Sequence, residues 1–128
     1  MVLGIIGILS SAIIFVINPV LQIKKGRDTT RKADLNNIRT SLEIYRQAEG
    51  RYPPEPLECD NVLEADGVVY MNRVPCDPQG GNYVYSVDPN AGVVYSIYAC
   101  LENEDDPDIA PESERAGLCD TAFILRNP

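Results

Sequence analysis

Residues 1–50, MVLGIIGILSSAIIFVINPVLQIKKGRDTTRKADLNNIRTSLEIYRQAEG, form the stretch that decides the fold of this chain. Because no Asp, Glu, Lys or Arg precedes Lys24, a helix over the first part would be apolar on every side. In the second part, one apolar residue per turn marks a single stripe, at Leu35, Ile38, Leu42 and Tyr45. Gly50 and the prolines that follow it end the pattern. The sequence therefore predicts one long helix with an apolar half and an amphipathic half.

Pro19 interrupts the apolar half of this predicted helix. Its ring removes one backbone hydrogen bond, so we expect a kink or a loosened turn near Phe15–Asn18. A cleaved signal peptide is the alternative for the apolar segment, but the segment has neither a basic N-terminal region nor a small-residue cleavage site. The sequence therefore predicts three parts: a hydrophobic membrane or filament-core half of the helix (1–23), an amphipathic half of the helix (24–50) and a globular head (51–128). The first part reaches the length of about 20 residues that is needed to cross a bilayer.

The head is predicted to contain a small antiparallel sheet. Residues 51–81 are rich in Pro and Gly and indicate an irregular connection, with a short strand or helical turn at Val68–Tyr70. The β-branched and aromatic runs NYVYSV and VVYSIYAC predict a β-hairpin over residues 82–100, and TAFIL at 121–125 supplies a third strand. The predicted fold class is α+β, with one long N-terminal helix packed through its apolar stripe on a sheet of about three strands.

Charge is unevenly distributed along the chain. The net charge is −8, yet residues 24–39 carry an excess of Lys and Arg, and the acidic excess lies in residues 40–128. An acidic head argues against specific nucleic-acid binding, which needs clustered Lys and Arg. The basic patch at 24–39 predicts contact with anionic lipid headgroups or with acidic surfaces of neighbouring subunits, and a solvated helix face is the alternative.

Four cysteines lie in the head, at Cys59, Cys76, Cys100 and Cys119. An even number of widely spaced cysteines next to a membrane segment predicts two disulfides in an oxidising compartment. Zinc is the competing interpretation, but it normally requires CxxC pairs or histidines, and this sequence contains neither. The sequence does not determine the connectivity. The pairs Cys59–Cys76 and Cys100–Cys119 are favoured, because each closes a short loop rich in Pro or Asp.

An acidic loop follows the predicted hairpin. Carboxylates and one amide carbonyl gather in it, at Glu102, Asn103, Glu104, Asp105, Asp106 and Asp108. Hard oxygen ligands at this density indicate a candidate calcium site without the ligand order of an EF-hand, and a solvated acidic surface is the alternative. No other metal or cofactor is predicted. Because the chain has no His, a Ser or Cys nucleophile lacks its commonest general base, and no enzyme is predicted.

Two stretches of this sequence resemble the type IV pilins and the type II secretion pseudopilins. The first joins VLGIIGIL at 2–9 to RDTTRKADLNNIRTSLEIYRQAEGRYP at 27–53, and resembles the N-terminal helix of this family. The second, VPCDPQGGNYVYSVDP at 74–89, is similar to the loop and first hairpin strand of pseudopilin-like heads. The chain begins late relative to family members. A basic leader and a glutamate near the mature N-terminus are therefore expected to precede Met1, unless the protein is processed differently.

The resemblance implies a pilin-like fold and a structural role in an extracellular filament that serves adhesion, motility, DNA uptake or secretion. The helix would hold the subunit in the filament core through Val2, Leu3, Gly4, Ile5, Ile6, Gly7, Ile8, Leu9, Ile13, Ile14, Phe15, Val16 and Pro19. The implied partners are other copies of this chain in a helical homopolymer, the inner-membrane pilus assembly machinery with its prepilin peptidase, and the lipid bilayer before assembly. The implied location is the cytoplasmic membrane and then the cell surface.

Two alternatives to a major pilin stay open. One is a pseudopilin of a type II secretion-like system, which would be scarce and would form only short fibres. The other, of a different class, is a membrane-anchored extracellular binding head that forms no filament. Calcium dependence of such a head would follow from its acidic loop, since the resemblance implies calcium binding in a loop near this position.

Overall fold

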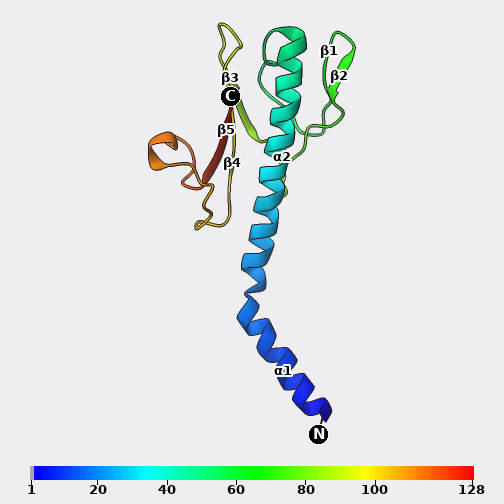
Figure 1. Ribbon diagram of the computed structural model, residues 1–128, viewed down its shortest axis with the longest axis vertical. Helices are drawn as coiled ribbons and strands as arrows, with labels where there is room; N and C mark the ends of the chain where they lie inside the picture. The colour runs from blue at the N-terminus through cyan, green and yellow to red at the C-terminus, as the bar shows by residue number, and fades with distance from the viewer. Residues whose placement is uncertain (1) are drawn as a thin grey trace.

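The computed structural model describes the backbone of residues 2–128 and the side chains of residues 2–11 and 18–128. Within this part of the chain, two helices, α1 (Val2–Ile17) and α2 (Pro19–Glu49), form a bent stem, and the head flanks the C-terminal part of α2 (Figure 1). The predicted α+β class, with a long N-terminal helical segment packed on small antiparallel sheets, is confirmed.

The stem is interrupted at Asn18, which has left-handed backbone angles (φ 45°, ψ 78°). Asn tolerates this region better than most residues do, and its side-chain oxygen accepts a hydrogen bond from the N–H of Leu21 at 3.4 Å. Pro19 occupies the first position of α2, where a backbone N–H would have no helical partner in any case. The loosening expected near Phe15–Asn18 is therefore a complete break, and the single helix predicted over residues 1–50 is two helices.

The apolar helix α1 contains 16 residues and has no charged side chain. None of the helices in the described part of the chain is both long enough and apolar enough to cross a membrane. The sequence prediction counted residues 1–23 as one continuous apolar span. The break at Asn18 divides this span between α1 and α2, and its role as a membrane or filament-core segment stays a prediction.

The second helix, α2, carries the apolar stripe that the sequence predicts. Its four residues are all buried: Leu35, Ile38, Leu42 and Tyr45. The helix ends where Gly50 adopts a left-handed conformation (φ 78°), from which its N–H donates to the carbonyl of Arg46 at 2.8 Å. Glycine adopts this conformation at little cost, and it satisfies a carbonyl group that the helix end would otherwise leave open. Both the stripe and the end of the helix are confirmed.

The main sheet of the head has three strands, β3 (Val84–Val87), β4 (Tyr95–Cys100) and β5 (Ala122–Arg126). They are antiparallel in the order β3-β4-β5, and Tyr85 of β3 pairs with Ile97 of β4. Both of these side chains are buried, whereas Val84 is exposed, as the alternation of side chains along a strand requires. The predicted hairpin and third strand are confirmed, with β5 placed one residue later than the sequence predicted.

A second sheet pairs β1 (Leu63–Ala65) with β2 (Val68–Met71). Asp66 and Gly67 form the turn between the strands, and both have positive φ (48° and 81°). Tight two-residue hairpins require this conformation, which makes Asp-Gly one of their preferred sequences. The sequence-based prediction placed only a strand or turn at 68–70 and missed β1, because three residues are too few to show an alternating pattern.

The core of the head lies between α2 and the two sheets. The helix contacts β2 on one side and β4 and β5 on the other (Figure 1). Tyrosine rings fill much of this core, and four of them are at most 6% exposed: Tyr52, Tyr83, Tyr85 and Tyr95. The long connection between β4 and β5 contains one short 3-10 turn, η1 (Glu112–Glu114). The stripe of α2 is therefore the surface on which both sheets are assembled.

Replacing Leu42 by Ala should destabilise the head by about 2–5 kcal/mol, because the substitution removes a fully buried side chain and leaves a cavity. The measurement is denaturant unfolding of the full chain in detergent, followed by the near-ultraviolet circular dichroism of the tyrosines. Ile44→Ala on the same helix is the control. Ile44 is 51% exposed, so its replacement should change the unfolding free energy by about 0.5 kcal/mol or less. Equal effects of the two substitutions would contradict this description of the core.

Candidate functional site

The first helix presents apolar side chains that this chain does not cover. Among residues 2–11, six large apolar side chains are more than half exposed: Val2, Leu3, Ile5, Ile6, Ile8 and Leu9. Of the other residues predicted for the filament core, Gly4, Gly7 and Pro19 are also exposed, and the side chains of Ile13, Ile14, Phe15 and Val16 lie outside the described residues. Soluble monomers rarely expose a continuous apolar surface of this size, so α1 requires a partner or lipid.

The glycines of α1 touch no other part of the chain that the structure describes. A Cβ added at Gly4 or Gly7 would have no atom within 4 Å, so no intrachain contact requires glycine at either position. The hydroxyls of Ser10 and Ser11 donate to carbonyl oxygens of the preceding turn at 2.8 Å, which satisfies both groups inside the helix. The surface of α1 is therefore apolar and has places where another helix can approach closely.

A cluster of ion pairs joins the head to α2 near the point where the helix enters it. We call it the Arg31 cluster, and it comprises Asp28, Arg31, Asp77 and Glu102. The guanidinium of Arg31, which is 2% exposed, donates to Asp28 at 2.8 Å and to Glu102 at 2.9 Å. It also donates to Asp77 at 2.7 and 3.0 Å and to Gln79 at 2.9 Å. These partners are necessary, because a buried charge without them costs several kcal/mol.

Asp28 connects the same cluster to the backbone of the head. Its carboxylate is 1% exposed and accepts hydrogen bonds from the N–H groups of Glu102, at 2.9 and 3.1 Å, and Asn103, at 2.8 Å. Arg27 donates through two nitrogens to the carboxylate of Glu102, both at 2.6 Å, which is the strong bidentate geometry. The loop after β4 is thus held to α2 through both its backbone and its side chains.

The arginines keep the carboxylates of this cluster charged. The hydrogen bonds from Arg27 hold the pKa of Glu102 at about 2, although partial burial opposes this shift. Burial acts to raise the pKa of Asp77, but the hydrogen bonds from Arg31 and from the N–H of Gln79, together with the charge of Arg31, outweigh it, and the pKa lies below its usual value of 3.8. Conversely, the hydrogen bonds to Asp77 raise the pKa of Arg31. The ion pairs therefore persist well below neutral pH.

Lys32 holds the acidic loop that the sequence predicted to bind calcium. Its ammonium contacts the carboxylates of Asp106 at 2.6 Å and Asp108 at 2.7 Å. Together with Glu102, three of the six predicted calcium ligands are thus paired with basic side chains of α2. In the part of the chain that the structure describes, the six residues do not form a metal-binding group. Calcium binding by this loop stays a prediction, and an ion would have to compete with these basic side chains for Glu102, Asp106 and Asp108.

Five of the six basic residues in the predicted patch at 24–39 fall into two groups in the structure. Arg27, Arg31 and Lys32 bind carboxylates of the same chain, and contact of these three residues with lipid or neighbouring subunits stays a prediction. Lys24 and Lys25 lie nearer to α1 and make no salt bridge among the described side chains. Lys24 and Lys25 therefore remain available for the outward role that the sequence suggested.

The sequence-based prediction does not identify the Arg31 cluster, although one signal for it is present. Asp28 and Arg31 continue the apolar stripe of α2, because the spacing of three and four residues runs from 28 through 31 to Leu35 and beyond. A charged pair on the buried face of a helix indicates a buried ion pair. No such local signal marks Asp77 or Glu102, which lie 46 and 71 positions from Arg31.

The two disulfides lie next to the loops that contact α2. Cys59 is bonded to Cys76, which directly precedes Asp77. Cys100 is bonded to Cys119 and closes the loop that contains Glu102. Each cross-link thus limits the movement of a segment that supplies a carboxylate to the Arg31 cluster.

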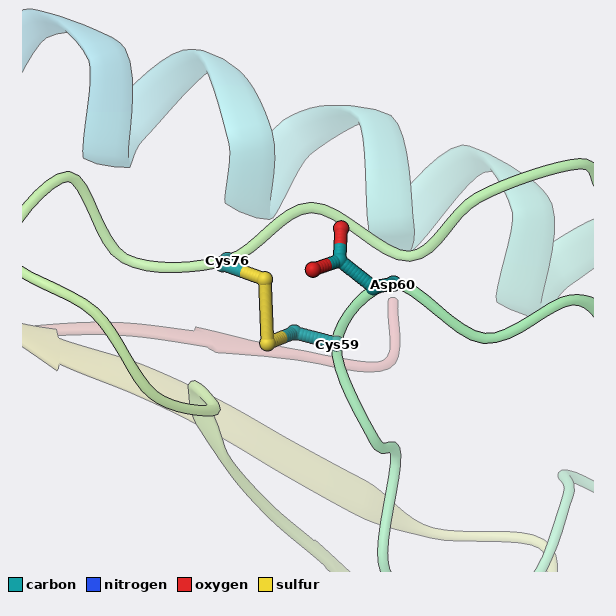
Figure 2. A group of neighbouring side chains, drawn as sticks. All are labelled: Cys59, Asp60 and Cys76. Carbon is teal, nitrogen blue, oxygen red and sulfur yellow. A yellow bond between two sulfur atoms is a disulfide. The ribbon is translucent and has the colours of Figure 1, made fainter.

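Asp60 lies beside the first of these disulfides, as Figure 2 shows. Cys59, Asp60 and Cys76 bring their ligand atoms close together and are the group among the described residues whose spacing suits a metal ion. The two sulfurs are bonded to each other, however, and cannot act as thiolate ligands. The carboxylate of Asp60 pairs with Arg73 on the surface. The arrangement is a disulfide beside a surface ion pair.

A family model described as "Type II secretion system (T2SS), protein G" matches residues 18–108, which is more than half of the chain. The match begins at the break between α1 and α2, and it includes α2, the strands β1 to β4 and the Arg31 cluster. No curated protein and no solved structure matches the chain.

Replacing Arg31 by Met should destabilise the head by about 3–5 kcal/mol, because Asp28 would keep a buried charge without its cationic partner. Denaturant unfolding of the full chain in detergent measures the effect. Arg73→Met is the matched control: its ion pair with Asp60 is exposed on both sides, so the expected loss is about 0–1 kcal/mol. If Arg31→Met cost no more than Arg73→Met, the Arg31 cluster would not be holding the head to α2.

The melting temperature of the head should fall as the pH is lowered from about 4.5 to about 2. The pKa of Glu102 is lowered from 4.5 to about 2 in the folded state, so its stabilisation is complete above pH 4.5 and is lost as protonation proceeds toward pH 2. Thermal unfolding of the full chain between neutral pH and pH 2 tests this. Arg27→Gln removes the main cause of the shift and should make the decline shallower; identical pH profiles for the two proteins would refute the assigned cause.

Proposed function

The chain belongs to the type II secretion system protein G family, and on this premise we propose that it is the pseudopilin subunit of a secretion filament. Membership of the family makes it a pilin-like filament subunit with a structural role, and not an enzyme. The assignment to secretion, in place of adhesion, motility or DNA uptake, is supported by the family description, which names a secretion system.

The exposed apolar surface of α1 is the observation that carries this proposal. Each Å² of apolar surface removed from water contributes about 25 cal/mol, so α1 is stable outside a membrane only when other helices cover it. Copies of α1 packed in parallel provide that cover for every subunit. Contacts between different faces of identical subunits, if they do not close into a ring, build a helical filament. Gly4 and Gly7 would allow the helices to approach closely in such a core.

The head supports this function because it is firmly joined to α2. The Arg31 cluster and the ion pairs of Lys32 attach two loops, at 76–79 and 102–108, to the side of the helix. The apolar stripe attaches both sheets to the same helix. The position of each head in a filament would therefore follow from the position of its own α2, and no separate head-to-core attachment is needed.

Before assembly, the apolar surface of α1 would be covered by the lipid of the cytoplasmic membrane. The partners at that stage would be a prepilin peptidase and the inner-membrane assembly machinery, which transfers subunits from the bilayer into the filament. The head would lie on the oxidising side of the membrane, where its two disulfides persist. After assembly, the same chain would be part of a filament outside the cytoplasm.

Filaments sheared from cells that express this secretion system should contain the chain, and Ile6→Asp should abolish them. Ile6 is 54% exposed on α1, and a carboxylate at this position would have to enter the filament core without a partner. The measurement is electron microscopy of the sheared fraction, with mass spectrometry of the same material. The amount of the chain in the membrane fraction is determined in parallel, so that loss of filaments is not confused with loss of the protein.

Val94→Asp is the control for this experiment. Val94 is 52% exposed between β3 and β4 of the head, so the same charge is introduced far from α1 and filaments should persist. Filaments that form normally with Ile6→Asp would contradict the packing of α1 in the core. A chain that stays with the membranes in every sample, with no filament containing it, would replace the proposal by that of a tethered binding head.

A further inference from the structure

Exposed apolar side chains occur on α1 and again on the first turns of α2, beyond the break at Asn18. Val20 and Ile23 are 61% and 57% exposed. Lys24 and Lys25 follow directly, so the character of the surface changes from apolar to basic within one residue. The first turns of α2 lie between α1 and the head (Figure 1). The stem therefore has a sharp apolar-to-basic boundary just below the head.

Lys24 and Lys25 form no ion pair with the head among the described side chains, although the charge of Lys25 helps to lower the pKa of Asp106. Neither ammonium makes a salt bridge among the described side chains, whereas Arg27, Arg31 and Lys32 all pair with carboxylates. The first acidic residue along α2 is Asp28, and it is buried in the Arg31 cluster, where it cannot neutralise them. Two positive charges thus remain at the end of the apolar surface.

We propose that Lys24 and Lys25 bind anionic phospholipid headgroups while the apolar side chains on their N-terminal side enter the hydrocarbon of the bilayer. Lysine suits this boundary, because its aliphatic stem lies along apolar surface and its ammonium reaches the polar layer. Anionic headgroups attract such residues with a strength that depends on salt. The site would hold the unassembled subunit at a defined depth in the membrane and would select for anionic lipid.

A lipid surface fits this pair better than the acidic head of a second copy does. The lysines are continuous with the exposed apolar residues Val20 and Ile23, and a bilayer interface offers hydrocarbon and anionic groups in that same order. The remaining surface of the protein supports the same orientation, because the head is strongly acidic and an anionic membrane repels it. The proposal goes beyond the filament role, since it specifies the lipid that the chain prefers before assembly.

The test compares binding of the full chain to two kinds of vesicle, one of pure phosphatidylcholine and one with roughly a third phosphatidylglycerol. Flotation of the vesicles gives a partition coefficient for each, and their ratio is the anionic selectivity. The double variant Lys24→Gln/Lys25→Gln should reduce this ratio about 30-fold, which corresponds to about 1 kcal/mol for each lysine. Raised salt should reduce the selectivity of the wild-type chain but have little effect on the variant.

Arg51→Gln/Arg126→Gln is the matched control, because it removes the same number of charges from exposed positions in the head and should leave the selectivity unchanged. If both double variants lost the same amount of anionic selectivity, the effect would come from net charge alone, and the proposal would be overturned. A wild-type chain without anionic selectivity would also overturn it. The proposal would also be overturned if Lys24→Gln/Lys25→Gln kept the anionic selectivity of the wild-type chain but weakened self-association in detergent. That result would mean that the lysines contact a second copy of the chain. None of these results affects the filament proposal, which rests on α1.

Discussion

The buried guanidinium of Arg31 is the constraint on which the two loops that contain Asp77 and Glu102 depend. It lies on the face of α2 that points into the protein, and carboxylates from outside the helix offset the cost of burying its charge there. Asp77 and Glu102 meet this requirement, and each belongs to a loop with little regular structure of its own. The two disulfides reduce the entropy that those loops lose when they bind the arginine, so cross-links and ion pairs stabilise the same segments.

One helix thus holds its head by two different kinds of interaction. Toward its C-terminal end, α2 buries Leu35, Ile38 and Leu42 against two sheets, and this contact is apolar and non-directional. Toward its N-terminal end, Asp28 and Arg31 occupy the same face and make directional contacts with loops. In this way the head covers the inner face of α2 from Asp28 to Leu42. The apolar surface of α1 and the first turn of α2 remains for lipid and other subunits.

Sequence-based prediction succeeded for features that depend on neighbouring residues and failed for features that depend on residues far apart in the chain. The stripe of α2, its end at Gly50 and the hairpin of β3 and β4 depend on local periodicity and local turn chemistry, and all were predicted. The strand β1 was missed because its few residues have no periodicity, although Asp66-Gly67 marks the turn. The calcium prediction arose from the density of carboxylates in one loop. That density does not reveal that Lys32, more than seventy positions earlier, pairs with the same carboxylates.

The sequence by itself determined that the chain has an apolar N-terminal helix that its own head cannot cover, followed by an amphipathic helix and a small cysteine-containing head. Composition and periodicity are properties of neighbouring residues, and they suffice for these conclusions. Only the tertiary structure decided which charges of residues 24–39 face inward and which face outward. The reason is physical: whether an arginine is buried depends on carboxylates that folding brings to it from distant loops, so Arg31 became part of the core while Lys24 and Lys25 stayed on the surface.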